Sequence, residues 1–146
     1  MMRRLTSAPK PCARVSAMAK TVGFQGGRIV AVPGAGTFEV YDVLDSAYAR
    51  AGDETGVLGL PVEQQQLLVD GRYQRFQTGR ISVTGGVGFF TRGPIAGRYV
   101  ETGAEVGALG YPTTDEYLSS PGVRRNDFQH GSISYDEATG QVTVSS

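Results

Sequence analysis

The feature that most constrains this chain is a short motif that recurs at a fixed distance. The motif has the form Phe-Gln-x-Gly-x-Ile, and its three copies begin 52 residues apart, at Phe24, Phe76 and Phe128. A constant period of this size is typical of repeat proteins, in which each unit must pack on its neighbour to bury its apolar face. The chain is therefore predicted to be an array of tandem units.

A second motif recurs between the copies of the first. It reads YARAGDETGVLGLP from Tyr48 to Pro61 and YVETGAEVGALGYP from Tyr99 to Pro112, an offset of 51 residues. Both copies contain the pattern Gly-x-Glu-x-Gly-x-Leu-Gly-x-Pro. One Leu between glycines, followed by Pro, is typical of a tight loop, and we expect the Leu to insert into a neighbouring unit.

Composition and charge narrow the classes of structure and partner. The 146 residues include 21 Gly and 7 Pro, which favours turns and short elements over long helices. The 14 basic and 14 acidic side chains cancel, so the charge gives no reason to expect nucleic acid or an anionic membrane as the partner. No apolar run approaches the roughly 18 residues of a membrane span. We therefore expect a neutral partner and no membrane span.

The start of the chain carries few structural signals. Its basic residues are not followed by the apolar run of a signal peptide, so no signal is recognised. The single Cys12 cannot form an internal disulfide or a metal cage alone, and no cofactor or metal site is predicted. Residues 1–22 are rich in Pro, Ser, Ala and Arg, and we expect them to form a disordered or loosely packed leader.

Turn chemistry predicts the strands of each unit. Each Phe-Gln-x-Gly-x-Ile motif fits a β-hairpin with a two-residue turn. A second turn at 33–36 extends the first hairpin into a three-strand meander. Turns at Asp70-Gly71 and Pro121-Gly122 lead into the strands of the later copies.

Apolar spacing and end signals predict one short helix in each unit. A helix is expected over 43–50, with Asp42 as its N-cap and Gly52 just past its end. In the next unit Gly93 takes the cap position and Pro94 the first helical position, where its missing N–H costs nothing. The expected fold is thus α+β, mainly β. A half repeat spans 23–47, whole repeats span 48–98 and 99–146, and together they form a repeat domain over 23–146.

At these residues the chain resembles the LGFP repeat, a unit of about fifty residues in cell-wall-associated proteins of actinobacteria. The resemblance rests on LGLP and LGYP, on GYPTTDE from Gly110 to Glu116, and on the three hairpin motifs, and it covers residues 24 to 144. The chain departs from the family at Leu60, where an aromatic residue is usual, and in having no Trp. The resemblance implies hairpins and helices set around a pseudo-symmetry axis, in a propeller-like or open-arc arrangement. It also implies an extracellular or cell-wall location beside mycolyltransferases and amidases, with binding to arabinogalactan or peptidoglycan.

The candidate binding residues lie on the strand before each hairpin turn. Along GRYQRFQ the side chains of Tyr73, Arg75 and Gln77 share one face, opposite the expected core residue Phe76. An aromatic ring that can stack on a sugar, beside donors for its hydroxyls, is typical of a polar-ligand site. The counterparts in the second copy are Tyr111, Arg125 and Gln129.

A structural alternative exists for the glutamines of the motif. Gln25, Gln77 and Gln129 are kept in all three copies while the flanking polar residues differ. Their amides are therefore interpreted more readily as ties between a loop backbone and the sheet than as ligand contacts.

Three other features are weaker candidates for chemistry. His130 lies at a turn position that holds Gly or Thr in the other copies, so it is interpreted as a solvated turn residue. Asp115 and Glu116 are adjacent, and Thr113 with Glu116 has the spacing of a capping box for one helical turn. The Gly-rich segment 85–88 lacks the Lys-Ser/Thr of a phosphate loop. No catalytic residue is predicted.

The sequence thus favours a non-catalytic module that binds cell-wall polysaccharide in clefts between repeats, with weak sites made useful by repetition. The alternative is a structural or protein-interaction module that self-associates or packs on a cell-wall enzyme domain, and an enzyme fragment comes third. Sugar binding predicts that Tyr73 and Tyr111 are exposed in a concavity. An interaction module predicts a contiguous apolar patch at one end of the array.

Overall fold

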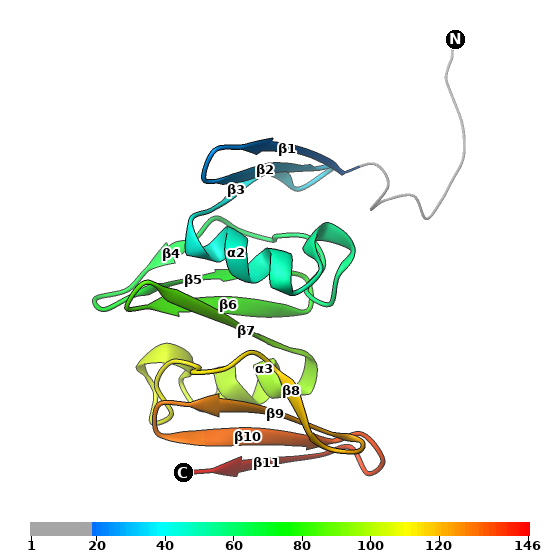
Figure 1. Ribbon diagram of the computed structural model, residues 1–146, viewed down its shortest axis with the longest axis vertical. Coiled ribbons are helices and arrows are strands. Elements are labelled where there is room, and N and C mark those ends of the chain that lie inside the picture. The colour runs from blue at the N-terminus through cyan, green and yellow to red at the C-terminus, as the bar shows by residue number, and fades with distance from the viewer. Residues whose placement is uncertain (1–18) are drawn as a thin grey trace.

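The computed structural model describes residues 19–146 as three antiparallel sheets with a short helix between each pair of layers (Figure 1). This confirms a mainly β fold built from tandem units. Most of the leader expected over 1–22 lies outside the described residues. Lys20 to Val22, however, belong to the first strand, because they pair with the strand that follows the first hairpin motif.

The first sheet, sheet 1, is the meander that the turn chemistry predicts. Its strands, in the order β1-β2-β3, are β1 (Lys20–Phe24), β2 (Gly27–Val32) and β3 (Gly36–Tyr41). Phe24 pairs with Gly27 across a two-residue turn in which Gly26 has φ 97°. Glycine adopts this left-handed conformation without a steric penalty.

Sheets 2 and 3 repeat the same three strands and add one more on the far side. Sheet 2 has the order β4-β5-β6-β7, with β4 (Gln66–Leu67), β5 (Arg72–Arg75), β6 (Gly79–Thr84) and β7 (Val87–Arg92). Sheet 3 has the order β11-β10-β9-β8, with β8 (Tyr117–Ser120), β9 (Val123–Phe128), β10 (Gly131–Asp136) and β11 (Gln141–Ser145). The added strands β4 and β8 come from the segments that follow the two LGxP loops.

Each helix is followed by one 3₁₀ turn. The first pair is α2 (Val43–Arg50) and η2 (Asp53–Thr55), and the second is α3 (Gly93–Glu101) and η3 (Ala104–Val106). Gly52 and Gly103 follow the helices with φ of 102° and 105°, as predicted for residues just past a helix end. Among residues 19–146 no helix is long and apolar enough to cross a membrane.

The helix predicted over 43–50 and its N-cap residue Asp42 are confirmed, but three expected details of the helix starts are wrong. The Asp42 side chain does not cap α2, because its carboxylate pairs with Arg72 at 3.1 Å. The second helix begins at Gly93 rather than after it, and Arg92 precedes it. Thr113 and Glu116 form no capping box, because this segment is not helical and the Glu116 carboxylate binds Arg92 and Arg124.

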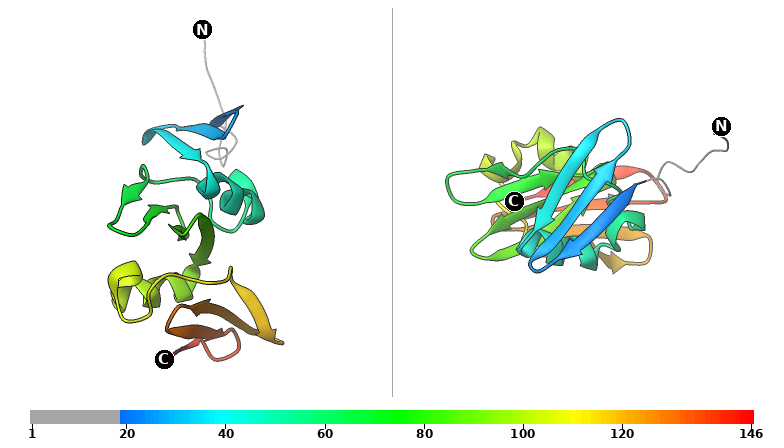
Figure 2. Two further views of the ribbon diagram at one scale, coloured as in Figure 1. Left: turned by 60° about the vertical axis from the view of Figure 1, so that its left-hand side comes forward. Right: turned by 90° about the horizontal axis from the view of Figure 1, so that it is seen from above.

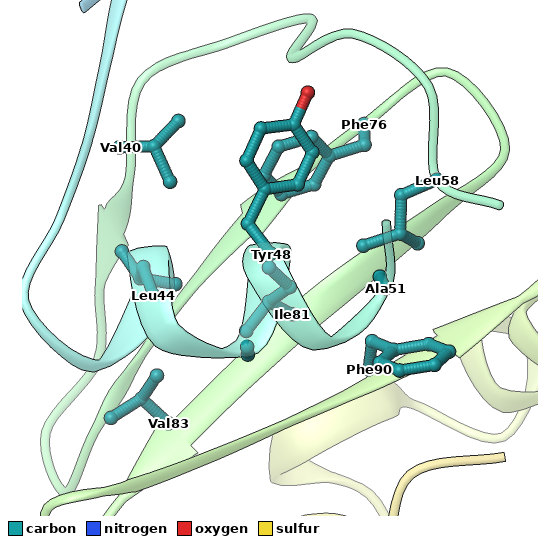
Figure 3. Close-up of a cluster of buried hydrophobic side chains, with 10 residues drawn as sticks. Val40, Leu44, Tyr48, Ala51, Leu58, Phe76, Ile81, Val83 and Phe90 are labelled. Atoms are coloured by element: carbon teal, nitrogen blue, oxygen red, sulfur yellow. The ribbon is translucent and has the colours of Figure 1, made fainter. Parts of the chain in front are cut away.

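The core lies between the layers rather than within one of them. Helix α2 packs on β6 and β7 of the next sheet as well as on its own β3, and α3 packs on β6 and β7 and also on β10 and β11. The first core cluster therefore joins Val40 of sheet 1, Leu44 and Tyr48 of α2, Leu58 of the LGLP loop and Phe76 of sheet 2 (Figure 3). The packed units accordingly run from α2 to β7 and from α3 to β11. Each of them begins a few residues earlier in the chain than the predicted repeats 48–98 and 99–146.

The layers follow one another in a row along the long axis (Figures 1 and 2). Sheets 1 and 3 lie at opposite ends, so a propeller-like closure is not seen within residues 19–146. Amide side chains tie the layers together. Gln74 donates to the Glu39 carbonyl at 3.1 Å, and Asn126 donates to the Phe90 carbonyl at 3.0 Å. Each of these bonds satisfies one carbonyl on the outer edge of β3 or β7, an edge that would otherwise be open to other strands.

Candidate functional site

A cleft of about 590 Å³ opens between the second and third layers. One wall is the tip between β4 and β5, and the other is η3 with the LGYP loop and the third hairpin turn. We call it the interlayer cleft. The side chains that line it include Leu67, Val69, Asp70, Val106, Gln129 and His130. It lies between two repeats, and ligand binding there stays a prediction.

The rim of the interlayer cleft is apolar and open to solvent. Leu67, Val69 and Val106 are 76%, 107% and 80% exposed. Leu67 and Val69 are held out by a tight turn in which the Leu68 N–H donates to the Gly71 carbonyl at 2.7 Å. Exposed aliphatic side chains beside polar groups give a surface that can contact the C–H face of a ligand and its hydroxyls together.

A buried ion pair lies beneath this cleft. The Arg80 guanidinium donates to both oxygens of Glu105, at 2.7 and 3.1 Å, and the Ser82 hydroxyl donates to the same carboxylate at 2.6 Å. The Arg80 guanidinium also lies 4.0 Å from the centre of the Tyr73 ring. The two charged side chains are only 8% and 3% exposed, so the pair fixes η3 against sheet 2, and Glu105 also forms part of the lining of the cleft.

Tyr111 is buried, and the prediction that it is exposed is wrong. It is 3% exposed, and its hydroxyl donates to the Asp70 carboxylate of the preceding unit at 2.7 Å. The ring lies against Gly71, where a Cβ would come within 2.5 Å of the hydroxyl oxygen. Burial raises the pKa of Tyr111, and the hydrogen bond to Asp70 raises it further. Tyr111 thus supports the wall of the interlayer cleft and holds Asp70 at its edge.

Gln77 and Gln129 have the structural role left open by the sequence. The Gln77 side-chain oxygen accepts the Leu60 N–H at 3.0 Å, and that of Gln129 accepts the Tyr111 N–H at 3.1 Å. Each amide therefore ties an LGxP loop to the hairpin of the same packed unit. Both residues remain exposed, and Gln129 also lines the interlayer cleft.

The other predicted site residues do not converge on one surface. Arg75 forms an ion pair with Glu63 at 3.0 Å and shares a smaller cleft of about 250 Å³ with Gln77. Arg125 pairs with Asp127 at 2.7 Å on sheet 3. Tyr73 is half-buried beside Arg80. The six residues therefore occupy different places around the layers, and their contact with a ligand stays a prediction.

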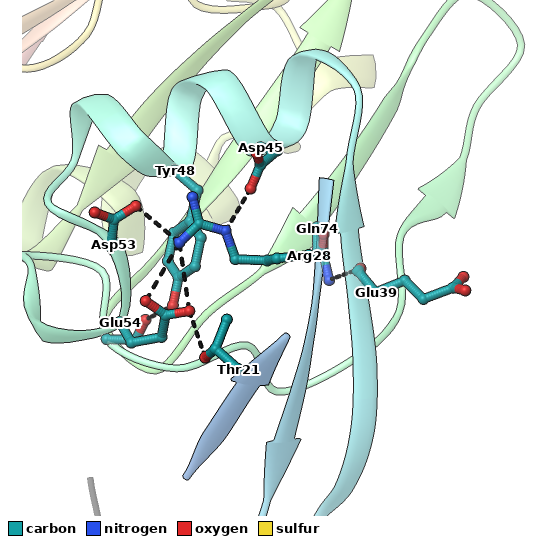
Figure 4. A network of polar contacts seen from close by, with 9 residues as sticks. Thr21, Arg28, Glu39, Asp45, Tyr48, Asp53, Glu54 and Gln74 are labelled. Atoms are coloured by element: carbon teal, nitrogen blue, oxygen red, sulfur yellow. Dashed lines mark hydrogen bonds and ion pairs between the residues drawn. The ribbon is translucent and has the colours of Figure 1, made fainter. Parts of the chain in front are cut away.

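A second polar cluster joins sheet 1 to α2 and η2 (Figure 4). Arg28, the counterpart of Arg80, contacts Asp45 at 2.5 Å, Asp53 at 2.8 Å and Glu54 at 3.3 Å. The Thr21 hydroxyl donates to Glu54 at 2.6 Å. Burial alone would raise the pKa of Glu54, but the hydrogen bond from Thr21 and the charge of Arg28 lower it below its ordinary value. Glu54 is therefore ionised and bound in the folded state.

The interlayer cleft contains residues that the sequence reasoning did not select. Leu67, Val69 and Val106 form its rim. The only signal for Leu67 and Val69 was an apolar run directly before the Asp70-Gly71 turn, and Val106 lies outside that run. His130 is exposed as predicted, yet it also lines this cleft. Residues 19–146 contain no group of three or more His, Cys, Asp or Glu side chains that could hold a metal ion.

Comparison with known proteins supports the repeats found in the sequence. The sequence model of the LGFP repeat matches residues 58–107 and 109–146, which together make up more than half of the chain. The two matches begin at the Leu-Gly-x-Pro loops and include the hairpins of sheets 2 and 3, whereas sheet 1 lies before them. A comparison with curated proteins gave no match. The chain belongs to the LGFP repeat family.

Proposed function

We propose that this protein is a non-catalytic cell-wall module that binds a wall glycan in the interlayer cleft. The observation that carries the proposal is the cleft itself, which lies between two repeats and combines an apolar rim with polar side chains. Aliphatic groups pack on the C–H faces of sugar rings, while Asp70, Gln129 and His130 offer partners for hydroxyls. The proposal places the protein outside the cell, in an arabinogalactan or peptidoglycan layer.

A shallow cleft of this kind suits a polymer better than a small free sugar. Its rim side chains are almost fully exposed, so a single sugar would leave much of its surface in water. A polysaccharide can instead engage several weak sites at once, and the effective concentration of the later contacts compensates for weak affinity at each. The second, smaller cleft beside Arg75 and Gln77 is a place for such a further contact.

Binding to isolated walls tests the proposal. The purified chain is mixed with insoluble actinobacterial wall before and after removal of the arabinogalactan, and the bound fraction is measured. The double variant Val69→Ser, Val106→Ser replaces two apolar side chains of the rim with polar ones. Because both valines are exposed and make no core contacts, we expect the bound fraction to fall severalfold without loss of folding. Val87→Ser, at an exposed valine that begins β7, is the matched control.

Each part of this experiment has an outcome that contradicts the proposal. Equal binding of the rim variant and the control means that the interlayer cleft does not hold the glycan. Equal binding to whole and stripped wall excludes arabinogalactan as the ligand and leaves peptidoglycan. Absence of binding to both walls removes the glycan function altogether.

One observation favours a second function, protein interaction. Val22 and Phe24 are 65% and 46% exposed and lie two residues apart on β1, at one end of the stack, where the sequence predicts an apolar patch for an interaction module. Apolar surface at the end of an array is the expected mark of a binding face.

A further inference from the structure

The outward face of sheet 1 exposes side chains whose counterparts are buried in the other two sheets. Phe24 is 46% exposed, whereas Phe76 and Phe128 are 4% and 5% exposed. Ile29 is half-buried, while the isoleucines of the other two motifs are fully buried. We call the surface formed by Val22, Phe24, Ile29 and Ala31 the open face. Because the motif is the same in all three sheets, the difference lies in what covers it.

In sheets 2 and 3 this face is covered by a helix that carries a tyrosine. The Tyr48 ring of α2 lies on Phe76 with 4.7 Å between ring centres, and Tyr99 of α3 lies on Phe128 at 4.6 Å. The tyrosine hydroxyls donate to the Gly59 and Gly110 carbonyls, which fixes each helix to its own Leu-Gly-x-Pro loop. Helix and loop therefore cover the sheet as one piece.

The hairpin turn binds that loop through its backbone. The Gln77 and Thr78 N–H groups donate to the Leu60 and Leu58 carbonyls at 2.9 and 3.1 Å. In sheet 3 the corresponding N–H groups donate to the carbonyls of the LGYP loop at 2.9 and 3.1 Å. The loop leucine lies over the glycine of the motif, within 2.8 Å of where a Cβ on Gly79 would stand.

Sheet 1 has kept the groups that contact the helix and the Leu-Gly-x-Pro loop in sheets 2 and 3. Phe24 offers the ring, Gln25 the side-chain acceptor, and Gln25 and Gly26 the turn N–H groups. Gly27 has no side chain that would block a leucine, and Ile29 corresponds to the isoleucines that are buried under the helices in sheets 2 and 3. The surface is thus specific for a helix joined to a Leu-Gly-x-Pro loop, and not merely apolar.

We propose that the open face binds, from another protein, a helix with an inward tyrosine followed by a Leu-Gly-x-Pro loop. Residues 1–18 contain no aromatic residue and no Leu-Gly pair, so such a segment is not encoded there. A second copy of this chain could supply one only by uncovering its own sheet 2 or sheet 3, whose core residues are packed under α2 and α3. In this proposal the partner is a different protein with an LGFP-type segment, which gives the second proposed function its ligand.

The side chain of Val22 limits which parts of a repeat unit the open face can bind. The equivalent residues in sheets 2 and 3 are Gln74 and Asn126, whose side-chain amides donate to the edge strand of the preceding layer. Val22 has no donor, so the open face cannot form this bond to a preceding sheet edge. The expected occupant is the helix and loop, without a further sheet bound through this position.

A peptide with the sequence of residues 42–62 serves as the probe, because it contains Tyr48 and the LGLP loop. The full isotope-labelled chain is titrated with it and the backbone amides are followed by NMR. We expect saturable shifts at Gln25 and Gly26, and binding at least tenfold weaker for Phe24→Ala. Leu118→Ala, at an exposed leucine on sheet 3, should bind as the natural chain does. A peptide with Ala in place of Tyr48 and Leu58 should not bind.

A graft tests the same surface without the entropy cost of a free peptide. A second copy of residues 42–71 is placed directly before Lys20, which reproduces the spacing between helix and hairpin found in sheet 2. We expect a higher unfolding temperature than for the natural chain. Phe24→Ala should lower the unfolding temperature of the graft but not that of the natural chain, where Phe24 is exposed.

Several outcomes overturn the inference. A graft that is no more stable, with Phe24→Ala acting equally in both chains, shows that the open face accepts no helix. A stabilised graft without binding of the free peptide up to millimolar concentration excludes a partner in another protein. A dimer of the natural chain that Phe24→Ala dissociates in the ultracentrifuge identifies a second copy as the occupant instead. Because none of these tests uses cell wall, their failure is distinct from failure of the glycan proposal.

Discussion

Arg28 and Arg80 occupy the same position of the repeat, but the two interfaces that they hold are built differently. Arg28 joins sheet 1 to the layer of α2 and shares its charge among Asp45, Asp53 and Glu54. Arg80 joins sheet 2 to η3 and has a single acidic partner, Glu105. The Glu105 side chain is 3% exposed, against 20% for Glu54.

An arginine at the same position of two repeats therefore need not contribute equally to the free energy of unfolding. A charge with several partners near solvent loses little when one partner is removed, because the others and water remain. A buried charge with a single partner loses its only compensation. The interface at Arg80 should therefore depend on one residue, and the interface at Arg28 on none in particular.

The largest expected effect is that of Glu105→Ala. It leaves the Arg80 guanidinium buried without a counter-charge and Ser82 without its acceptor, so we expect unfolding to become easier by about 3–5 kcal/mol. Chemical denaturation measures the loss. Glu54→Ala is the matched change at the other interface, and it should cost less than about 1 kcal/mol because Asp45 and Asp53 remain. Equal losses would contradict the comparison.

The double variant Arg80→Met, Glu105→Leu sharpens the same point. It removes both buried charges and fills their space with apolar side chains, which is often neutral for stability. We expect most of the loss caused by Glu105→Ala to be recovered in denaturation experiments. A double variant as unstable as the single one would mean that the ion pair has a positional role that apolar packing cannot supply.

A smaller effect is expected for Tyr111→Phe. The change removes the hydrogen bond to Asp70 but keeps the buried ring, so stability should fall by about 0.5–1.5 kcal/mol. Leu60 holds this place in the preceding unit and has no hydroxyl, so the bond is specific to the interface of the second and third layers. Hydrogen exchange of the amides around Asp70 should increase in the variant. Unchanged exchange would show that Asp70 is held by other contacts.

The smallest effect is a dependence on pH at the first interface. The pKa of Glu54 is lower in the folded chain than its ordinary value of 4.5. Its stabilising contribution is therefore complete above pH 4.5 and is lost as the pH falls through the lower folded pKa. Unfolding of the natural chain and of Glu54→Gln, compared from pH 7 to pH 3, should give curves that converge in this acid range. A constant gap would assign the contribution of Glu54 to something other than its charge.

Local structure was accessible from the sequence because it depends on neighbouring residues. Gly26, Gly52 and Gly103 have the positive φ that hairpin turns and helix ends require, and their positions predicted the elements that they bound. The capping predictions at Asp42 and Thr113 failed for one reason. Side chains near them in space, chiefly arginines from other strands, compete for the same carboxylates.

The candidate site was predictable only in outline. Clefts between repeats follow from the periodicity, but the residues that line them depend on which segments of two units meet. The sequence predicted a ligand contact for Tyr111. In the structure this side chain is buried against Gly71, which lies 40 residues earlier in the chain. Leu67, Val69 and Val106 come from both sides of the cleft and share no local motif.

By itself, the sequence determined the period, the hairpins, the helices and the family, because these follow from turn chemistry and spacing within a few residues. The tertiary structure decided burial, since burial depends on what the neighbouring layer supplies. Phe24, Phe76 and Phe128 belong to one motif, yet two are covered by a helix and loop and one is exposed. The contacts that distinguish them join residues far apart in the chain, where no local pattern records them.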